Sequence, residues 1–200
     1  MYEPQKFTLP TLDGISEKTL TEHLKLYAGY VKQLNHILTR IEELAKDSEA
    51  NAYELGELQR RLSFEWNGMK NHEVYFGGLI GGPTPLEENT LLAKSITERW
   101  GSLDLFLARF RAIGLTRGIG WALLAYDTPT DSLQTFWVDE QHLGIPSGVT
   151  ILLALDMWEH SYLMDYTPGE KGKYIDAYLK ALNWGVVHTR YEHARTHRVH

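Results

Sequence analysis

The segment TILLALDMWEHSYLMDY, residues 150–166, joins the most apolar run of the chain to charged groups at its end. The residues from Thr150 to Leu155 carry no charge, which favours a buried strand that stops abruptly on Asp156. His160 follows between aromatic side chains. A carboxylate buried alone is unstable unless it is paired, protonated or bound to a cation, and this segment contains no Lys or Arg. The fold must therefore bring a partner to Asp156 from elsewhere.

Composition excludes several classes of protein. With 200 residues, of which 43% are hydrophobic, the chain can form one domain or two halves that share a core. The absence of cysteine excludes a disulfide scaffold, a thiolate metal site and a cysteine nucleophile. A net charge of −6 argues against nucleic-acid binding and means that an anionic substrate would need a local positive patch. No apolar run approaches the ~20 residues of a membrane span, and we expect a soluble cytoplasmic protein.

The first part of the chain has the pattern of two helices. Ser16 is a plausible N-cap after the turn LDGIS, and apolar residues then recur at three- and four-residue spacing as far as Leu44. The polar stretch AKDSEANA interrupts this pattern, which resumes from Leu55 to Phe76. The glycine-rich stretch GGLIGGPTP, residues 77–85, is a clear stop signal. We predict an antiparallel helical hairpin domain over residues 1–84.

Residues 85–200 have a different pattern. A helical stretch in one or two pieces is followed by three strand-like runs, GWALLAYD, LQTFWVDE and VTILLALD, which predict a small antiparallel sheet. KYIDAYLKALNW reads as the final amphipathic helix. The polar tail after it is interpreted as a solvated helix end, and it contains His188, His193, His197 and His200. The fold class is therefore α+β, with a C-terminal α/β domain over residues 85–200.

Two histidines lie on the apolar stripes of the hairpin helices. His23 and His72 each occupy a position that should be buried, where a histidine is more often a satisfied core residue than a ligand. Together with Asp156 and His160, however, they could bind a cation that satisfies all four side chains at once. A set of imidazoles and a carboxylate suits iron, manganese or zinc. The alternative for Asp156 is a helix N-cap, because the residues that follow it are compatible with a helix.

The same residues carry a resemblance to a known family. DMWEHSYLMDY resembles the signature segment of the iron/manganese superoxide dismutases, and NHEVYF resembles the ligand segment of their second helix. TLTEHLKLYAGYVKQLN, GIGWALL and KYIDAYLKALNW are similar to the first helix, the strand entry and the last helix of the family. The resemblance spans nearly the whole chain in the same order. It implies a helical hairpin followed by an α/β half with a three-stranded antiparallel sheet.

The resemblance also implies the site. It implies one manganese or iron ion per chain, which is reduced by one superoxide ion and reoxidised by the next. Tyr30 matches the tyrosine at the substrate entrance of the family. Trp121 and Trp158 match aromatic walls, and Glu159 matches a glutamate that reaches a ligand histidine across a dimer interface. The metal ligands carried over by position are His23, His72, Asp156 and His160.

A glutamine often hydrogen-bonds the solvent on the metal in this family. Four residues before the second-helix histidine, this chain has Gly68, so the donor should come from DEQHLGIP instead. Gln141 is the first choice and His142 the alternative, because a one-residue gap exchanges them. A glycine in the helix together with Gln141 resembles the manganese-type arrangement, whereas a histidine would resemble members that work with either metal.

Some positions depart from the family pattern. The step from His23 to Tyr30 is seven residues instead of eight, which keeps both on one face of an undistorted helix. Leu26 and Tyr27 stand where a histidine pair is usual, and Leu163 replaces a tyrosine. These replacements put the proton route and the dimer contact in doubt, but not the four ligands.

We expect a superoxide dismutase that acts as a homodimer or a dimer of dimers. The first alternative is a metal-binding relative with little dismutase activity, which the replaced residues suggest. The second is a mononuclear iron oxygenase with two histidines and a carboxylate, against which the third histidine argues.

Overall fold

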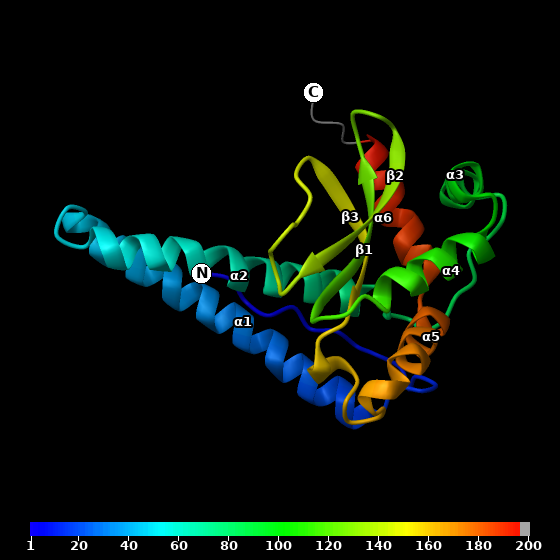
Figure 1. Ribbon diagram of the computed structural model, residues 1–200, viewed down its shortest axis with the longest axis horizontal. Helices are drawn as coiled ribbons and strands as arrows, with labels where there is room; N and C mark the ends of the chain where they lie inside the picture. The colour runs from blue at the N-terminus through cyan, green and yellow to red at the C-terminus, as the bar shows by residue number, and fades with distance from the viewer. Residues whose placement is uncertain (197–200) are drawn as a thin grey trace.

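The computed structural model describes residues 1–196 and consists of a long helical hairpin joined to a small sheet with helices around it (Figure 1). The helices are α1 (Glu17–Leu44), α2 (Ala52–Gly77), α3 (Leu91–Trp100), α4 (Leu103–Gly114), α5 (Lys171–Ala181) and α6 (Trp184–Thr196). The strands are β1 (Gly120–Asp127), β2 (Ser132–Asp139) and β3 (Val149–Asp156). Short 3-10 turns occur at Ala45–Asp47, Glu159–Ser161 and Pro168–Glu170. The predicted α+β class is confirmed.

The hairpin forms where the periodicity predicts it. Ser16 caps α1, because its hydroxyl accepts a hydrogen bond from the backbone N–H of Thr19 at 3.1 Å. α1 then continues without interruption to Leu44 and packs along α2. Asp165, far away in the sequence, adds a second link at the same end. Its Oδ2 accepts hydrogen bonds from the backbone N–H of Ser16 at 2.9 Å and from the Thr19 hydroxyl at 2.8 Å.

The sheet has three antiparallel strands in the order β2-β1-β3. β1 is central, and its residues from Gly120 to Tyr126 are buried, which explains why that segment reads as a continuous apolar run. The bounds predicted for β1 and β3 are confirmed, and β2 lies one residue earlier than predicted. At the end of β3, Asp156 lies opposite Trp121 of β1. The carboxylate of Asp156 therefore lies at the end of an edge strand that packs against α2.

Both parts of the chain contribute to one hydrophobic core. α2 packs against β3, and helices α3, α4 and α6 pack against the sheet (Figure 1). Buried residues such as Tyr27 and Phe76 of the hairpin belong to the same cluster as Leu123 and Tyr178. The junction of hairpin and sheet is thus fully packed, and a site built there can draw on both. Whether 1–84 and 85–200 are separate domains stays a prediction.

Up to Thr196 the C-terminal tail is helical, as interpreted, but solvent covers only one of its faces. KYIDAYLKALNW does not form one last helix: α5 ends at Ala181, and α6 begins at Trp184. α6 packs against α3 and β3 and buries Trp184, Val187, Tyr191 and Ala194. These residues recur at three- and four-residue spacing, but the polar residues between them mask the stripe. His197 and His200 lie outside the described residues.

Candidate metal centre

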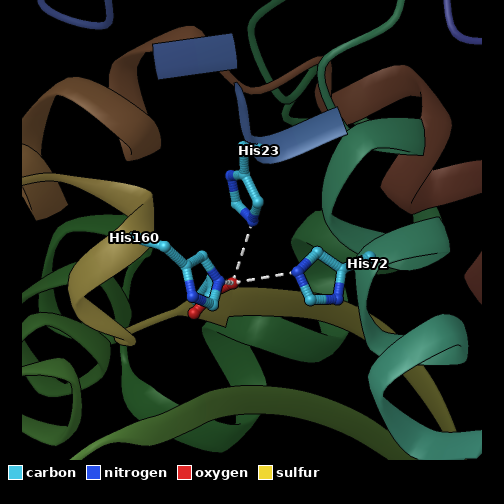
Figure 2. A group of neighbouring side chains, drawn as sticks. His23, His72 and His160 are labelled. Carbon is cyan, nitrogen blue, oxygen red and sulfur yellow. Dashed lines mark hydrogen bonds and ion pairs between the residues drawn. The ribbon is translucent and has the colours of Figure 1, made fainter. Parts of the chain in front are cut away.

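Three imidazoles and one carboxylate converge where the hairpin meets the sheet (Figure 2). His23 comes from α1, His72 from α2, Asp156 from the end of β3 and His160 from the turn Glu159–Ser161. One donor atom from each residue lies within 4.8 Å of the others. The fold therefore brings together all four residues that the sequence predicts as ligands.

The three histidines point at a single oxygen atom. Oδ2 of Asp156 lies 3.0 Å from Nε2 of His23, 3.0 Å from Nε2 of His160 and 3.4 Å from Nε2 of His72. The other carboxylate oxygen, Oδ1, accepts the backbone N–H of Trp158 at 2.8 Å. This hydrogen bond fixes the carboxylate, so that one oxygen is turned toward the histidines.

His72 provides the test of whether a cation fits here. Its Nδ1 lies 2.5 Å from the backbone carbonyl of Gly68, and a carbonyl can only accept, so Nδ1 carries the hydrogen. Nε2 then presents a lone pair to the oxygen of Asp156, and among residues 1–196 it has no hydrogen-bond partner. Two lone pairs facing each other in a fully buried space are repulsive unless a positive charge lies between them. The donor set is therefore that of a metal site.

The pKa shifts agree with neutral imidazoles around an ionised carboxylate. Burial lowers the pKa of His72 to about 3 and also lowers that of His23, because an imidazolium loses its hydration there. Burial alone would raise the pKa of Asp156, but His160 and His23 outweigh it through charge and hydrogen bonding and hold that pKa well below its ordinary value. Neutral imidazole and carboxylate are the forms that bind a metal ion.

The chain after Asp156 folds into a tight turn and not into a helix capped by it. The backbone N–H of Met157 donates to Gly120, and the Ser161 hydroxyl donates to the backbone carbonyls of Asp156 and Trp158. The short 3-10 turn that follows begins after Trp158, so the alternative of Asp156 as a helix N-cap was wrong. The turn brings His160 back over the carboxylate.

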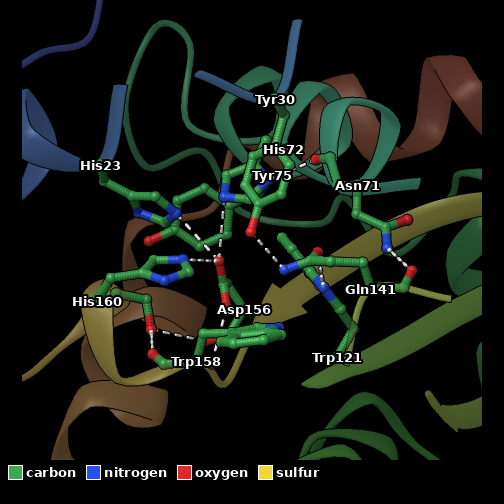
Figure 3. Close-up of polar contacts among 12 residues, drawn as sticks. His23, Tyr30, Asn71, His72, Tyr75, Trp121, Gln141, Asp156, Trp158 and His160 are labelled. Atoms are coloured by element: carbon green, nitrogen blue, oxygen red, sulfur yellow. Dashed lines mark hydrogen bonds and ion pairs between the residues drawn. The ribbon is translucent and has the colours of Figure 1, made fainter. Parts of the chain in front are cut away.

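A hydrogen-bonded row of three side chains lies beside the cluster (Figure 3). The amide nitrogen of Gln141 donates to the hydroxyl of Tyr30 at 2.9 Å, and its Oε1 accepts from Nε1 of Trp121 at 2.8 Å. Gln141 is completely buried in the loop after β2. His142 is only partly buried and packs its ring against Phe64, with centroids 5.6 Å apart. The structure therefore places Gln141 beside the cluster and His142 outside it.

Tyr30 fills the space that Gly68 leaves on α2. A Cβ atom at Gly68 would collide with Cδ1 of the Tyr30 ring, so only glycine lets the ring lie there. The ring centroid is 5.1 Å from that of His72. Because α1 is a regular α-helix throughout, the seven-residue step keeps Tyr30 on the same face as His23. Burial, with the charges of Asp156 and Glu65, raises the pKa of Tyr30, which keeps the phenol protonated.

One side of the cluster reaches solvent. The side chain of His160 is 20% exposed, whereas those of His23, His72 and Asp156 are 0% exposed. Trp158 stacks on His160 with centroids 5.9 Å apart and is itself half-buried, like Tyr30. We call Tyr30, Trp158 and His160 the open side, and His23, His72 and Asp156 the closed side.

The residues that depart from the family pattern have different fates. Tyr27 is buried, and its ring lies 6.3 Å from that of His72. Its hydroxyl accepts the backbone N–H of Gln5 and donates to Glu73, so it belongs to the core beside the cluster. Leu163 is 43% exposed and lies close in sequence to Glu159, which is exposed as well.

The sequence reasoning missed two supporting residues. Asn71 is buried next to His72, and its side-chain N–H donates to the backbone carbonyl of Gln141 at 3.3 Å, which fixes the loop that carries this glutamine. Asp165 ties the start of α1, which carries His23, to the segment that carries His160. Asn71 stands in the quoted segment NHEVYF and was detectable there, whereas the contact of Asp165 with Ser16 joins residues that are 149 positions apart.

Comparison with known proteins identifies the family. Residues 7–80 match the alpha-hairpin domain, and residues 88–190 the C-terminal domain, of the iron/manganese superoxide dismutases. Proteins named superoxide dismutase (Mn) from Mycobacterium intracellulare and Mycobacterium avium are each 38% identical to this chain, and one from Mycolicibacterium fortuitum is 35% identical. In all three cases the similarity covers 93% of both chains. The chain therefore belongs to the iron/manganese superoxide dismutase family, an oxidoreductase with a site for one manganese or iron ion.

Proposed function

We propose that the chain dismutes superoxide at the cluster of His23, His72, Asp156 and His160, and that Tyr30 and Gln141 handle the proton. The net reaction converts two superoxide ions and two protons into oxygen and hydrogen peroxide. The observation that carries the proposal is the buried lone pair of His72, which faces the oxygen of Asp156 at 3.4 Å and requires a cation. When bound, manganese or iron supplies a one-electron couple that accepts an electron from one superoxide and returns it to the next.

The protein residues supply the proton and the geometry. Tyr30 accepts a hydrogen bond from Gln141, which leaves its own O–H free to donate toward the cluster. Gln141 cannot rotate, because Trp121 holds its oxygen. The pair therefore presents a fixed phenol donor that stays protonated through the working pH range.

The aromatic residues exclude water from the reacting groups. Trp121 is completely buried, with its ring centroid 5.0 Å from that of His72. Trp158 covers His160 on the open side, and its Nε1 donates to the backbone carbonyl of Glu140 at 3.2 Å. Among buried groups such as His72 and Trp121, each hydrogen bond and charge has a larger effect than in water.

We propose manganese as the preferred metal. Gly68 on α2 with Gln141 beside the cluster matches the manganese-type arrangement, and relatives with 35–38% identity carry Mn in their names. The test is superoxide turnover per bound metal after separate reconstitution with manganese and with iron. High turnover with manganese alone supports the proposal, and equal turnover with both metals would contradict the preference. Full occupancy without turnover by either would favour a metal-binding relative that lacks activity.

A homodimer that forms through residues 159–164 is proposed as well. Glu159 is exposed next to His160, and the exposed apolar side chains of Leu163 (43%) and Met164 (48%) lie in the same segment. A second copy would cover these side chains and let Glu159 reach the turn of the partner subunit that carries its metal-ligand histidine. A dimer of dimers is the alternative assembly. Sedimentation equilibrium of the intact chain and of Leu163→Lys tests this, because a buried lysine should weaken the dimer.

A cytoplasmic location is proposed as well, and cell fractionation with detection of the chain tests it. Among residues 1–196, no helix combines the length and the apolar character that a membrane crossing requires.

A further inference from the structure

One buried carboxylate lies outside the cluster. Glu65 on α2 is only 6% exposed, although glutamate is rarely buried without a partner. Its Oε1 accepts a hydrogen bond from Nε of Arg61 at 3.0 Å, one helical turn earlier. The Arg61 side chain itself is 50% exposed. An exposed arginine is thus anchored by a buried acid.

The guanidinium of Arg61 is held from a second direction. Its central carbon lies 3.6 Å from the centroid of the Phe64 ring, a cation–π distance. The carboxylate of Glu65 accepts from Nε, and the ring of Phe64 packs against the guanidinium carbon. Among residues 1–196, neither Nη1 nor Nη2 of Arg61 has a hydrogen-bond partner. Two fixed donor groups therefore remain free for a ligand.

The position of this stack relates it to the metal centre. The Phe64 ring lies 6.1 Å from the ring of Tyr30 and 6.3 Å from that of Trp158, two of the three residues of the open side. Arg61 therefore packs against a ring that lies next to the open side of the cluster.

Charge makes this position significant. Superoxide is an anion, and the chain carries a net charge of −6, so the molecule as a whole repels its substrate. Arg61 brings a positive charge close to the open side, because its guanidinium packs on the ring of Phe64.

We propose that Arg61 binds the incoming superoxide anion outside Tyr30, and that Glu65 is the positioning residue that holds Arg61 in place. The inference rests on the proposed dismutase function. Far from the pair, the negative charge of Glu65 cancels part of the attraction between Arg61 and the anion. At close range, however, the half-exposed guanidinium can bind the anion through its free Nη groups, whereas the carboxylate of Glu65 is buried.

The chain offers a matched control for Arg61. Arg60 is the next residue on α2 and is paired with Glu57 at 2.7 Å, but its side chain is 71% exposed and has no ring contact with the open side. Arg61→Gln and Arg60→Gln make the same change in net charge. A difference between them reports position alone.

The experiment measures kcat/KM for superoxide by stopped flow over a range of ionic strength, on metal-loaded protein of equal metal content. Arg61→Gln is expected to lower kcat/KM about tenfold at low salt and to flatten its salt dependence, with a much smaller effect of Arg60→Gln. Equal effects of the two variants would overturn the proposal, because only net charge would then matter.

A second readout does not depend on turnover. Azide is a small monoanion, and its association rate with the manganese-loaded protein can be followed by absorption. Arg61→Gln should slow this association by a similar factor, and an unchanged rate would contradict the role of Arg61. If azide association depends on Arg61 although superoxide is not consumed, the anion site stands and the dismutase function fails.

The role of Glu65 has its own test. Glu65→Gln and Glu65→Ala remove the same charge, but only glutamine keeps an oxygen that can accept from Nε of Arg61. Glutamine should keep or raise kcat/KM, and alanine should lower it. Equal results would show that Glu65 does not position Arg61. If Glu65→Ala does not fold, Arg61→Lys replaces it. Lysine keeps the positive charge but cannot be held by both Glu65 and Phe64, so kcat/KM should fall nearly as far as in Arg61→Gln. An unchanged kcat/KM would show that only the charge matters.

Discussion

His72 and His160 offer the same kind of ligand atom to the same carboxylate oxygen, but from opposite sides of the metal centre. On the closed side, the backbone of Gly68 fixes the tautomer of His72, and neither His72 nor Asp156 is exposed. On the open side, His160 is 20% exposed, and the ring of Trp158 stacks on it. In the proposed mechanism, the closed side retains the cation and the open side admits the anion and the proton. Changes on the two sides should therefore affect different measurements.

The largest effect is expected from Asp156→Ala on the closed side. This change removes the only carboxylate of the cluster and leaves three imidazoles without a counter-charge. Metal affinity should fall by more than about 100-fold, which exceeds the loss typical of residues that merely support a ligand. Metal content per chain, measured by mass spectrometry after dialysis against a chelator, checks this. Asp176→Ala removes an exposed acid paired with Arg111 and should retain the metal; equal retention by the two variants would contradict the ligand set.

On the open side, Tyr30→Phe should leave the metal in place and slow turnover. The ring still fills the space over Gly68, but the phenol that Gln141 holds is lost. We expect a decrease of roughly 10- to 100-fold at high superoxide concentration, the range for a positioned proton donor. Tyr27→Phe is the matched control, because its hydroxyl bonds Gln5 and Glu73 away from the open side. Turnover equal to that of the unaltered protein would remove Tyr30 from the mechanism.

The closed side should also make the metal-free protein sensitive to acid. The pKa of His72 is about 3 in the folded state, against 6.5 for an unperturbed histidine. The unfolded chain therefore binds a proton below pH 6.5 that the folded chain excludes, so stability is present above that pH and is lost as the pH falls toward 3. The free energy of unfolding should decrease by about 2 kcal/mol between roughly pH 7.5 and roughly pH 5.

Urea unfolding of the chelator-treated protein at these two pH values measures this decrease. In His72→Gln the decrease should be smaller, because the group that titrates has been removed. An unfolding free energy that rises toward acid, or the same slope in both proteins, would show that His72 is not buried in its neutral form.

The smallest effect is expected on stability, at the contact between Gly68 and the ring of Tyr30. Gly68→Ala gains helix propensity, but its Cβ meets the rigid ring of Tyr30, so the clash should win and cost about 1–2 kcal/mol. Gly56→Ala on the same helix has open space around the new Cβ and should stabilise the protein by about 0.5–1 kcal/mol. Thermal unfolding of the two variants compares them. Stabilisation by both would mean that Tyr30 does not pack on Gly68.

The fold was largely predictable because its elements follow local patterns. Residues close together in the sequence determine the apolar stripes of the hairpin, the Ser16 cap and the bounds of β1 and β3. α6 was missed for the same reason: polar side chains between Val187 and Tyr191 conceal the stripe that packs against α3 and β3.

The four ligands were predictable because each carries a local signal, an unusual polar group on an apolar stripe or at a strand end. Their surroundings were not. The choice between Gln141 and His142 depends on how a loop turns, and a shift of one residue exchanges them. Arg61 and Glu65 look like an ordinary surface pair on a helix, and only the packing of α2 against α1 and the sheet buries one of them.

The most direct test of the account is the position of the metal itself. Crystals of the manganese-loaded protein, measured at the manganese absorption edge, should show one anomalous peak per chain between the three Nε2 atoms and Oδ2 of Asp156. The peak should touch His72 at the nitrogen opposite the Gly68 carbonyl contact. A main peak at any other place, or one that His72 does not contact, would contradict the division of the site into a closed side that holds the ion and an open side that meets the substrate.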